Sequence, residues 1–177
     1  MDLALPPLNI PVYGVVSLGG VTTGLSLFAW DFTRWWTGHK KKLSSKALQT
    51  LAPQLLCLSY GALLILCVGG IIGGAADWSL WGTNTVGDIV LVYGFGSTTP
   101  AVTRASHLAL TPGGHAAVIV ITVVILAVCS KKGFRWDFVR QILAGISLGL
   151  ASSIAGFVGW AVAPSVSWLG DWVVGIL

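Results

Sequence analysis

Glutamate is absent from this sequence of 177 residues, and charged residues of any kind are scarce. Only 9% of the residues are charged, whereas 55% are hydrophobic. A soluble domain has roughly 25% charged residues, so this chain has too little charge to cover a water-facing surface. The composition therefore argues against an ordinary soluble domain and predicts an integral membrane protein.

Residues and motifs that support metal sites or catalysis are also few. The three cysteines lie in apolar runs, where a thiol behaves as a small hydrophobic group, and we expect no structural disulfide. The three histidines are not accompanied by an HExxH motif, a paired CxxC motif or a carboxylate cluster. These residues are Cys57, Cys67, Cys129, His39, His107 and His115. We therefore expect no metal, no cofactor and no enzymatic activity.

Long uncharged runs are the main feature that the sequence does contain. Four of them exceed the roughly 20 apolar residues that a helix needs to cross a bilayer core. They cover residues 3–30, 47–76, 105–130 and 141–170. Runs such as CLSYGALLILCVGGII lack the polar–apolar alternation of membrane strands. The sequence predicts an all-α integral membrane protein, a single domain with four transmembrane helices at about 12–32, 54–76, 114–130 and 141–163.

The basic residues define a predicted topology of two helical hairpins. Nine of the ten lie in two predicted loops, 33–53 and 131–140. By the positive-inside rule both loops are cytoplasmic, and both termini face outward. The nine are Arg34, Lys40, Lys41, Lys42, Lys46, Lys131, Lys132, Arg135 and Arg140. We expect them to contact anionic lipid headgroups of a plasma (inner) membrane; nucleic acid attracts the same side chains, but topology and lipid contact already explain them.

Two further segments complete the predicted topology. Residues 77–113 form the outer segment between the hairpins. Residues 164–177 read as an outer interfacial helix with tryptophans on one face. Two hairpins of equal orientation suggest a duplicated unit, as in transporters with parallel repeats. The segments TRWWTGHKKK and CSKKGFRWDFVR share little beyond charge and aromatic character, so independent selection for topology explains the similarity equally well.

Small residues four apart form seams on three of the four predicted helices. Such seams let helix backbones approach closely in lipid, where there is no water to expel. The residues are Gly20, Gly24, Gly69, Gly70, Gly73, Gly74, Gly145, Gly149, Ser153 and Gly156. A seam can pack the four helices of one chain or face a neighbouring copy. Because the seams are so numerous, we expect at least one to face a copy, and hence a homo-oligomer.

Asp31 stands three residues before Arg34, near the inner end of the first predicted helix. This spacing places the two side chains on one helix face, so we expect an interfacial salt bridge between them. Ionisable residues deep in the predicted spans are otherwise nearly absent, which argues against a proton-coupled transporter.

The stretch TVGDIVLVYGFGSTTP contains Gly94, Phe95 and Gly96, a glycine-aromatic-glycine pattern that loosely resembles potassium-channel selectivity filters. The resemblance fails in spacing, because Thr85-Val86-Gly87 is separate from it and a helix does not follow closely. We expect an ordered outer cap, lying at the interface or re-entering where protein covers its backbone.

Two functional hypotheses follow from these patterns. The first is a small homo-oligomeric pore, a channel or a holin-like assembly, in which small polar residues and a hydrophobic constriction conduct or gate. The second is a structural or accessory subunit, without conduction, of a larger membrane complex for secretion, DNA transfer or energy conversion. The residues themselves do not separate the two.

Overall fold

The computed structural model describes residues 15–39, 45–67, 70–97, 101–103, 110–132, 136–151 and 163–176. Within this part the chain is all-helical, which confirms the predicted secondary-structure class. The six α-helices are α1 (Leu18–His39), α2 (Ser45–Leu66), α3 (Gly70–Ile89), α4 (Pro112–Lys132), α5 (Trp136–Gly149) and α7 (Ala163–Ile176), and a π-helical turn, η1 (Val90–Gly94), extends α3. Strands β1 (Val15–Ser17) and β2 (Ala101–Thr103) form a short antiparallel pair.

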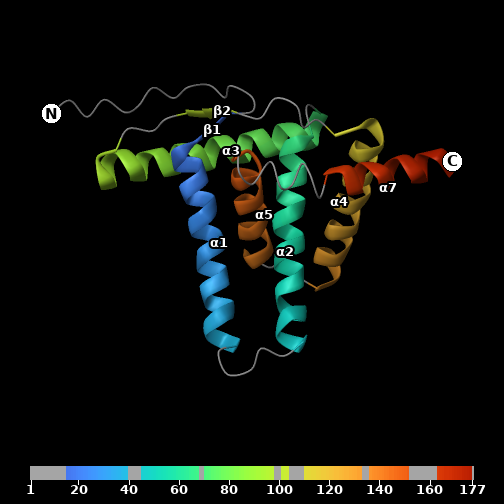
Figure 1. The fold of residues 1–177 in the computed structure, drawn as a ribbon, viewed down its shortest axis with the longest axis horizontal. Coiled ribbons are helices and arrows are strands. Elements are labelled where there is room, and N and C mark those ends of the chain that lie inside the picture. Colours follow the sequence, from blue (N-terminus) through green and yellow to red (C-terminus); the bar gives the residue numbers. More distant parts are fainter. Residues whose placement is uncertain are drawn as a thin grey trace.

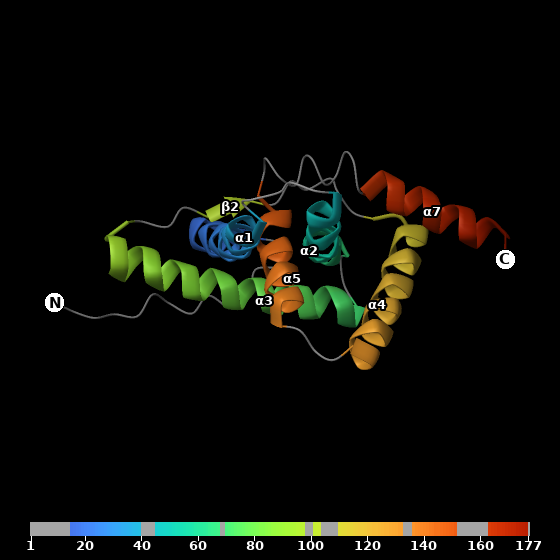
Figure 2. The same cartoon turned by 90° about the horizontal axis from the view of Figure 1, so that it is seen from below.

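Four helices stand side by side in the order α1, α5, α2, α4 (Figures 1 and 2). Helices α3 and α7 lie across one end of this row, which we name the crossing end (Figure 1). The helix ends that border the two basic loops all point away from α3 and α7, with those of α1 and α2 reaching furthest, and we name this side of the row the basic-loop end (Figure 1). Helices α2 and α5 both run from the basic-loop end to the crossing end, so they are parallel neighbours (Figure 1).

The structure supports the predicted membrane spans only in part. Among the described residues, no single helix is both long enough and apolar enough to cross a membrane. One pair of helices passes that test together, Leu51–Leu66 with Gly70–Gly94, but the pair is bent by 108°, and Pro112–Ala127 is a shorter apolar stretch. Asp31 and Arg34 add charge to α1, and α5 is described only over 14 residues.

The predicted helix 54–76 is two helices in the structure. Helix α2 ends at Leu66, and α3 begins at Gly70, whose φ of 71° lies in the left-handed region that favours glycine. Charge counting could not reveal this bend, because the run stays apolar on both sides of it. The outer segment 77–113 accordingly contains the second half of α3 together with η1.

The other predicted boundaries differ by smaller amounts. Helix α1 starts at Leu18 and not at residue 12, because residues 15–17 pair as β1 with β2. Helix α5 starts at Trp136, inside the predicted loop 131–140, and its predicted end at 163 cannot be compared because 152–162 lie outside the described residues. Helices α4 and α7 lie close to the predicted ranges 114–130 and 164–177.

Two apolar clusters fill the spaces between the helices. One gathers around α2 and the start of α4, with Leu110 and Val118 buried against α2. The other joins Val16, next to α1, to α5 and to the inner face of α3. The buried members of the first are Tyr60, Ala62, Leu63, Leu66, Cys67, Leu110 and Val118, and those of the second are Val16, Ile65, Ala76, Leu80, Ile146 and Leu150.

Candidate functional site

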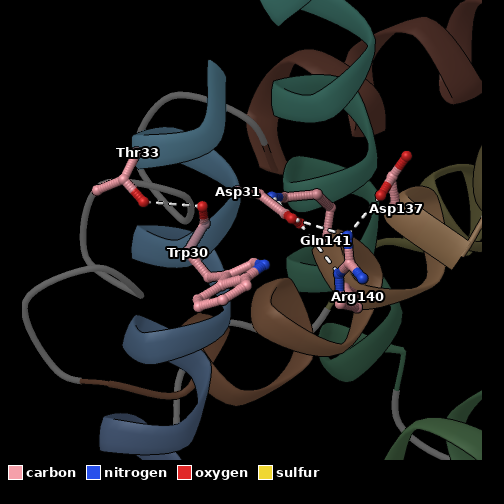
Figure 3. A network of polar contacts seen from close by, with 6 residues as sticks. All are labelled: Trp30, Asp31, Thr33, Asp137, Arg140 and Gln141. Carbon is pink, nitrogen blue, oxygen red and sulfur yellow. Dashed lines mark hydrogen bonds and ion pairs between the residues drawn. The ribbon is translucent and has the colours of Figure 1, made fainter. Parts of the chain in front are cut away.

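A buried polar cluster joins α1 to α5 near the basic-loop end (Figure 3). Asp31 is only 4% exposed. Arg140 donates from Nη2 to Asp31 Oδ1 over 2.9 Å, and Gln141 donates from Nε2 to Asp31 Oδ2 over 2.9 Å. Arg140 also pairs with Asp137, one turn earlier on α5. The carboxylate of α1 is thus held by two donors from a different helix.

This arrangement corrects the expected pairing of Asp31 with Arg34. Helix packing brings α5 against the face of α1 that carries Asp31, so the carboxylate meets donors on α5 and is removed from solvent. Arg34, three residues further on, is exposed. A salt bridge between helices could not be found from the spacing within one helix, because it depends on which helices are neighbours.

The carboxylate of Asp31 has hydrogen-bond donors at both oxygens, whereas Gln141 uses only its amide nitrogen in the cluster. The hydrogen bond to Asp31 raises the pKa of Arg140 above its ordinary value, so the guanidinium remains charged. Gln141 is 2% exposed, and its Oε1 has no hydrogen-bond partner among the described residues. The cluster can therefore fix two helices against each other.

Four glycines of the predicted seams pack inside the chain. Gly20 lies against the side chain of Asn84 on α3, and Gly24 lies against Ser147 on α5. Gly145 and Gly149 lie against α2. A Cβ at any of the four would come closer to its neighbours than packed atoms allow. These seams therefore serve the fold of one chain.

The glycines of α3 divide into an inner and an outer set. Gly73 is buried. Added Cβ atoms at Gly70, Gly74 and Gly82 would meet nothing within 4 Å. With the exposed Ile71 and Trp78 they form a surface that we name the open face of α3. Gly69, Ser153 and Gly156, also predicted to pack, lie outside the described residues.

Sequence reasoning missed several glycines that make the closest helix contacts. Gly61 of α2 faces Gly145 of α5, and Gly19 of α1 faces Gly87 of α3. The spacing of small residues does not identify them, because neither Gly61 nor Gly87 has a glycine four positions away. Only the position of the neighbouring helix identifies them.

Polar side chains link further pairs of helices. Thr122 of α4 donates to the carbonyl of Val118, so the 2.6 Å contact between Tyr60 Oη and Thr122 Oγ1 places the Tyr60 hydroxyl as donor. Ser147 of α5 donates to Thr83 of α3 over 2.9 Å. These bonds satisfy hydroxyl groups that would otherwise lie unpaired between apolar helices.

The side chain of Asn84 fixes the first strand. Its Nδ2 donates to the carbonyl of Val15, and its Oδ1 accepts from the backbone N–H of Ser17. The side-chain amide of Asn84 therefore bonds the Val15 carbonyl and the Ser17 N–H of β1. Strand β2, residues 101–103, pairs with β1 as its antiparallel neighbour. The Asn84 contact anchors the start of α1 to α3.

Gly94, Phe95 and Gly96 form the end of a helix. The carbonyls of Leu91 and Val92 accept hydrogen bonds from the backbone N–H groups that follow, at Phe95, Gly96 and Ser97. The backbone N–H groups of this stretch are thus used to close the helix end. The Phe95 side chain is 78% exposed.

The remaining predicted site residues are only partly described. Arg34 and Arg140 lie near the basic-loop end, whereas Lys40, Lys41, Lys42 and Arg135 and the side chains of Lys46, Lys131 and Lys132 fall outside the described part. His115 lies at the start of α4, with Nδ1 2.9 Å from the Thr111 carbonyl oxygen. Within the described ranges, no group of three or more histidine, cysteine or acidic residues is placed to hold a metal ion.

Comparisons with known proteins do not assign the chain to a family. No protein-family model matches the sequence, and no curated protein or solved structure is significantly similar to it.

Proposed function

We propose that the protein is a membrane-embedded helical unit that self-associates into a pore-like assembly. The observation that carries the membrane part of this proposal is a belt of exposed large apolar side chains on α1, α2 and α4. It includes Leu25, Leu55, Leu56, Ile119, Val120, Val123, Val124 and Leu126. Soluble monomers rarely expose contiguous apolar patches of more than a few hundred Å², whereas lipid tails accommodate them without cost.

Exposed tryptophans support the same proposal at both ends of the belt. Trp30, Trp36 and Trp136 are exposed toward the basic-loop end, and Trp78, Trp168 and Trp172 are exposed on the helices that cross the other end. Indole rings favour the headgroup level of a bilayer, where an apolar ring and a polar N–H are both accommodated. Helices α3 and α7 would then lie in the outer interface, and the basic loops would face the cytoplasm.

The pore part of the proposal places any conducting path between copies of the chain. At the centre of the row, Gly61 and Gly145 bring the backbones of α2 and α5 into contact. This contact leaves little room for a path between those two helices. The open face of α3 is the surface of small residues that a neighbouring copy would approach most closely.

The test is purification in detergent followed by native mass spectrometry and reconstitution into phosphatidylcholine–phosphatidylglycerol vesicles. We expect one defined homo-oligomer and release of potassium or a small dye from the vesicles. A monomer that inserts and does not conduct would overturn the pore proposal and favour an accessory subunit of a larger complex. Protein that does not partition into vesicles at all would overturn the membrane proposal as well.

A further inference from the structure

Helices α1 and α4 begin with the same local structure. Ser17 precedes Leu18-Gly19-Gly20, and Thr111 precedes Pro112-Gly113-Gly114. In both, the hydroxyl oxygen accepts from the backbone N–H of the second glycine, over 3.1 Å in each case. Ser17 and Thr111 are thus the N-cap residues, and each bonds the backbone N–H three positions further along the chain. The two starts are separated by 94 positions in the chain.

The surroundings of the two helix starts are equivalent as well. Gly19 lies against the carboxylate of Asp88 from α3, and Gly113 lies against the carboxylate of Asp171 from α7. Both acids follow a glycine, Gly87 and Gly170, and stand near the positive end of a helix dipole. In each crossing helix the acid faces the first glycine of the motif.

The second glycine of each motif has equivalent neighbours too. Gly20 is flanked by Val16 and Asn84, and Gly114 by Leu110 and Ser167. Val16 and Leu110 are again separated by 94 positions, and Asn84 and Ser167 by the 83 positions that separate Asp88 from Asp171. One pair of offsets therefore maps all of these contacts from the first half of the chain to the second.

The contact between α2 and α5 is self-complementary. A Cβ on Gly61 would overlap the carbonyl oxygen of Ile142, and a Cβ on Gly145 would overlap that of Leu58. Each oxygen belongs to the residue three positions before the opposite glycine. In parallel helices, this reciprocity is what a two-fold axis along the helices produces between identical partners.

Members of the two apolar clusters correspond as well, with an offset of 84 positions between α2 and α5. Leu110, Ala62 and Leu66 belong to one cluster, and their counterparts belong to the other: Val16 lies 94 positions before Leu110, and Ile146 and Leu150 lie 84 positions after Ala62 and Leu66. The helix order α1, α5, α2, α4 agrees with this correspondence (Figures 1 and 2). Helix α1 packs closely on α5, and α4 makes a smaller contact with α2.

We propose that the described parts of residues 16–88 and 110–171 are two copies of one helical unit, interleaved about a pseudo-two-fold axis between α2 and α5. Each unit then packs against the other copy of the same unit. This inference is independent of the proposed function, because it uses only contacts within the chain. It also selects between the two explanations that the loop sequences left open.

The polar cluster occurs in only one of the two equivalent helix contacts. It favours the interleaved packing, α1 on α5, over the packing of α1 on α2 within one hairpin. The counterparts of Asp31, Arg140 and Gln141 are Ile125, Leu56 and Cys57. If α1 packed on α2 of its own hairpin, the Asp31 carboxylate would lie against Leu56 and Cys57, without a donor. Burying an unpaired charge is strongly unfavourable, so Asp31 favours the packing of α1 on α5 over its packing on α2.

Disulfide cross-linking in the full chain tests whether Asp31 determines the neighbour of α1, which we call the selection step. In a background with the native cysteines replaced, Gly24→Cys with Ser147→Cys reports α1 on α5. An added Cβ at residue 24 would lie 2.9 Å from that of Ser147, so a shift of about 1 Å between the helices brings the two Cβ atoms to the roughly 3.8 Å of a disulfide. Gly24→Cys with Leu63→Cys reports α1 on α2, because Leu63 is the counterpart of Ser147. We expect only the first cross-link in the otherwise unchanged chain.

Removing the asymmetry should change the outcome. With Asp31→Ile, Arg140→Leu and Gln141→Val, we expect the second cross-link to form at the expense of the first. Exchanging the charges, Asp31→Arg with Arg140→Asp, should restore the first cross-link alone. The selection step is overturned if the apolar variant still forms only the first cross-link, or if the exchanged pair fails to restore it.

Matched substitutions test the duplication itself. Gly19→Ala and Gly113→Ala should lower the melting temperature by similar amounts, and their effects should add in the double variant, since the sites are equivalent and separate. Gly38→Ala is the control, because an added Cβ there meets nothing within 4 Å. A large effect at one site and none at the other would overturn the equivalence.

Discussion

The contact of Gly61 with Gly145 makes the sharpest prediction for a single residue. A methyl group at position 61 would overlap the Ile142 carbonyl oxygen, which belongs to backbone and cannot rotate away. We expect Gly61→Ala to destabilise the protein by about 2 kcal/mol, as overpacking of a close contact does. Thermal unfolding in detergent measures it.

Gly74→Ala is the matched control for this prediction. Gly74 is also a helical glycine, but an added Cβ there meets nothing within 4 Å, so the change should be neutral or slightly stabilising through helix propensity. Equal melting temperatures for the Gly61 and Gly74 variants would mean that α2 and α5 are not in backbone contact.

The hydroxyl of Tyr60 is a second test at the residue scale. It donates to Thr122 and supplies a polar link between α2 and α4. Tyr60→Phe keeps the ring in the apolar cluster and removes only this bond, so we expect a loss of about 1 kcal/mol in the free energy of unfolding. Thr122→Ser, which keeps the acceptor oxygen, should cost less. A Phe variant as stable as the parent would show that the bond contributes nothing.

The sequence could identify small residues but not their partners. Gly20, Gly24, Gly145 and Gly149 were predicted to pack, and the structure places each against another helix. Gly74 satisfied the same spacing rule and faces open space. The spacing rule describes one helix surface, whereas a contact requires two, so it cannot distinguish a seam from an exposed ridge.

At the scale of the element, the open face of α3 predicts where copies of the chain meet. Gly74→Leu with Gly82→Leu adds bulk where the chain itself offers no contact, so the fold should remain intact. If this face packs on a neighbouring copy, branched side chains will hold the two backbones apart. We expect the double variant to give a smaller native mass than the parent with unchanged helix content.

The opposite result for α3 is equally specific. A double variant that keeps the parent's native mass places the open face against lipid or water and moves the interface to another helix. Val123→Ala, a change at an exposed apolar position on α4, controls for general effects of altering the apolar surface.

The bend between α2 and α3 shows why element boundaries were harder to predict than element type. The uninterrupted apolar run predicts one helix through residue 76, with its glycines used in helix packing. At Gly70 the left-handed backbone conformation redirects the chain, and α3 becomes a crossing helix. Glycine permits both roles, and only tertiary contacts of α3 with α1 and α5 decide between them.

At the scale of the whole molecule, the two ends of the row should face opposite sides of a membrane. Gly38→Cys lies near the basic-loop end with open space around it, and Phe95→Cys lies at the exposed end of η1. We expect a membrane-impermeant maleimide to label residue 95 from outside and residue 38 only after the inner side is exposed. Labelling of both sites from one side would contradict the proposed topology.

Hairpin order was beyond the reach of sequence reasoning at this scale. Two hairpins with short basic loops suggest that α1 packs on α2 and α4 on α5, because sequential elements are usually neighbours in space. The structure interleaves them instead. The residues that favour this arrangement, Asp31 and Arg140, stand in different predicted elements and could be matched only once the helices were placed.

Interleaving also has a consequence for biosynthesis. Asp31 and Arg140 are 109 positions apart, so the carboxylate on α1 is made long before its donors. While the ribosome is still extending the chain, the first hairpin exists without the helix that will lie between its two arms. Contacts so distant in sequence form late and slowly. The newly made first hairpin must therefore leave space between α1 and α2 for α5. A chain truncated before Arg140 would lack both donors to Asp31, and this unpaired carboxylate would mark the chain for degradation by quality-control proteases.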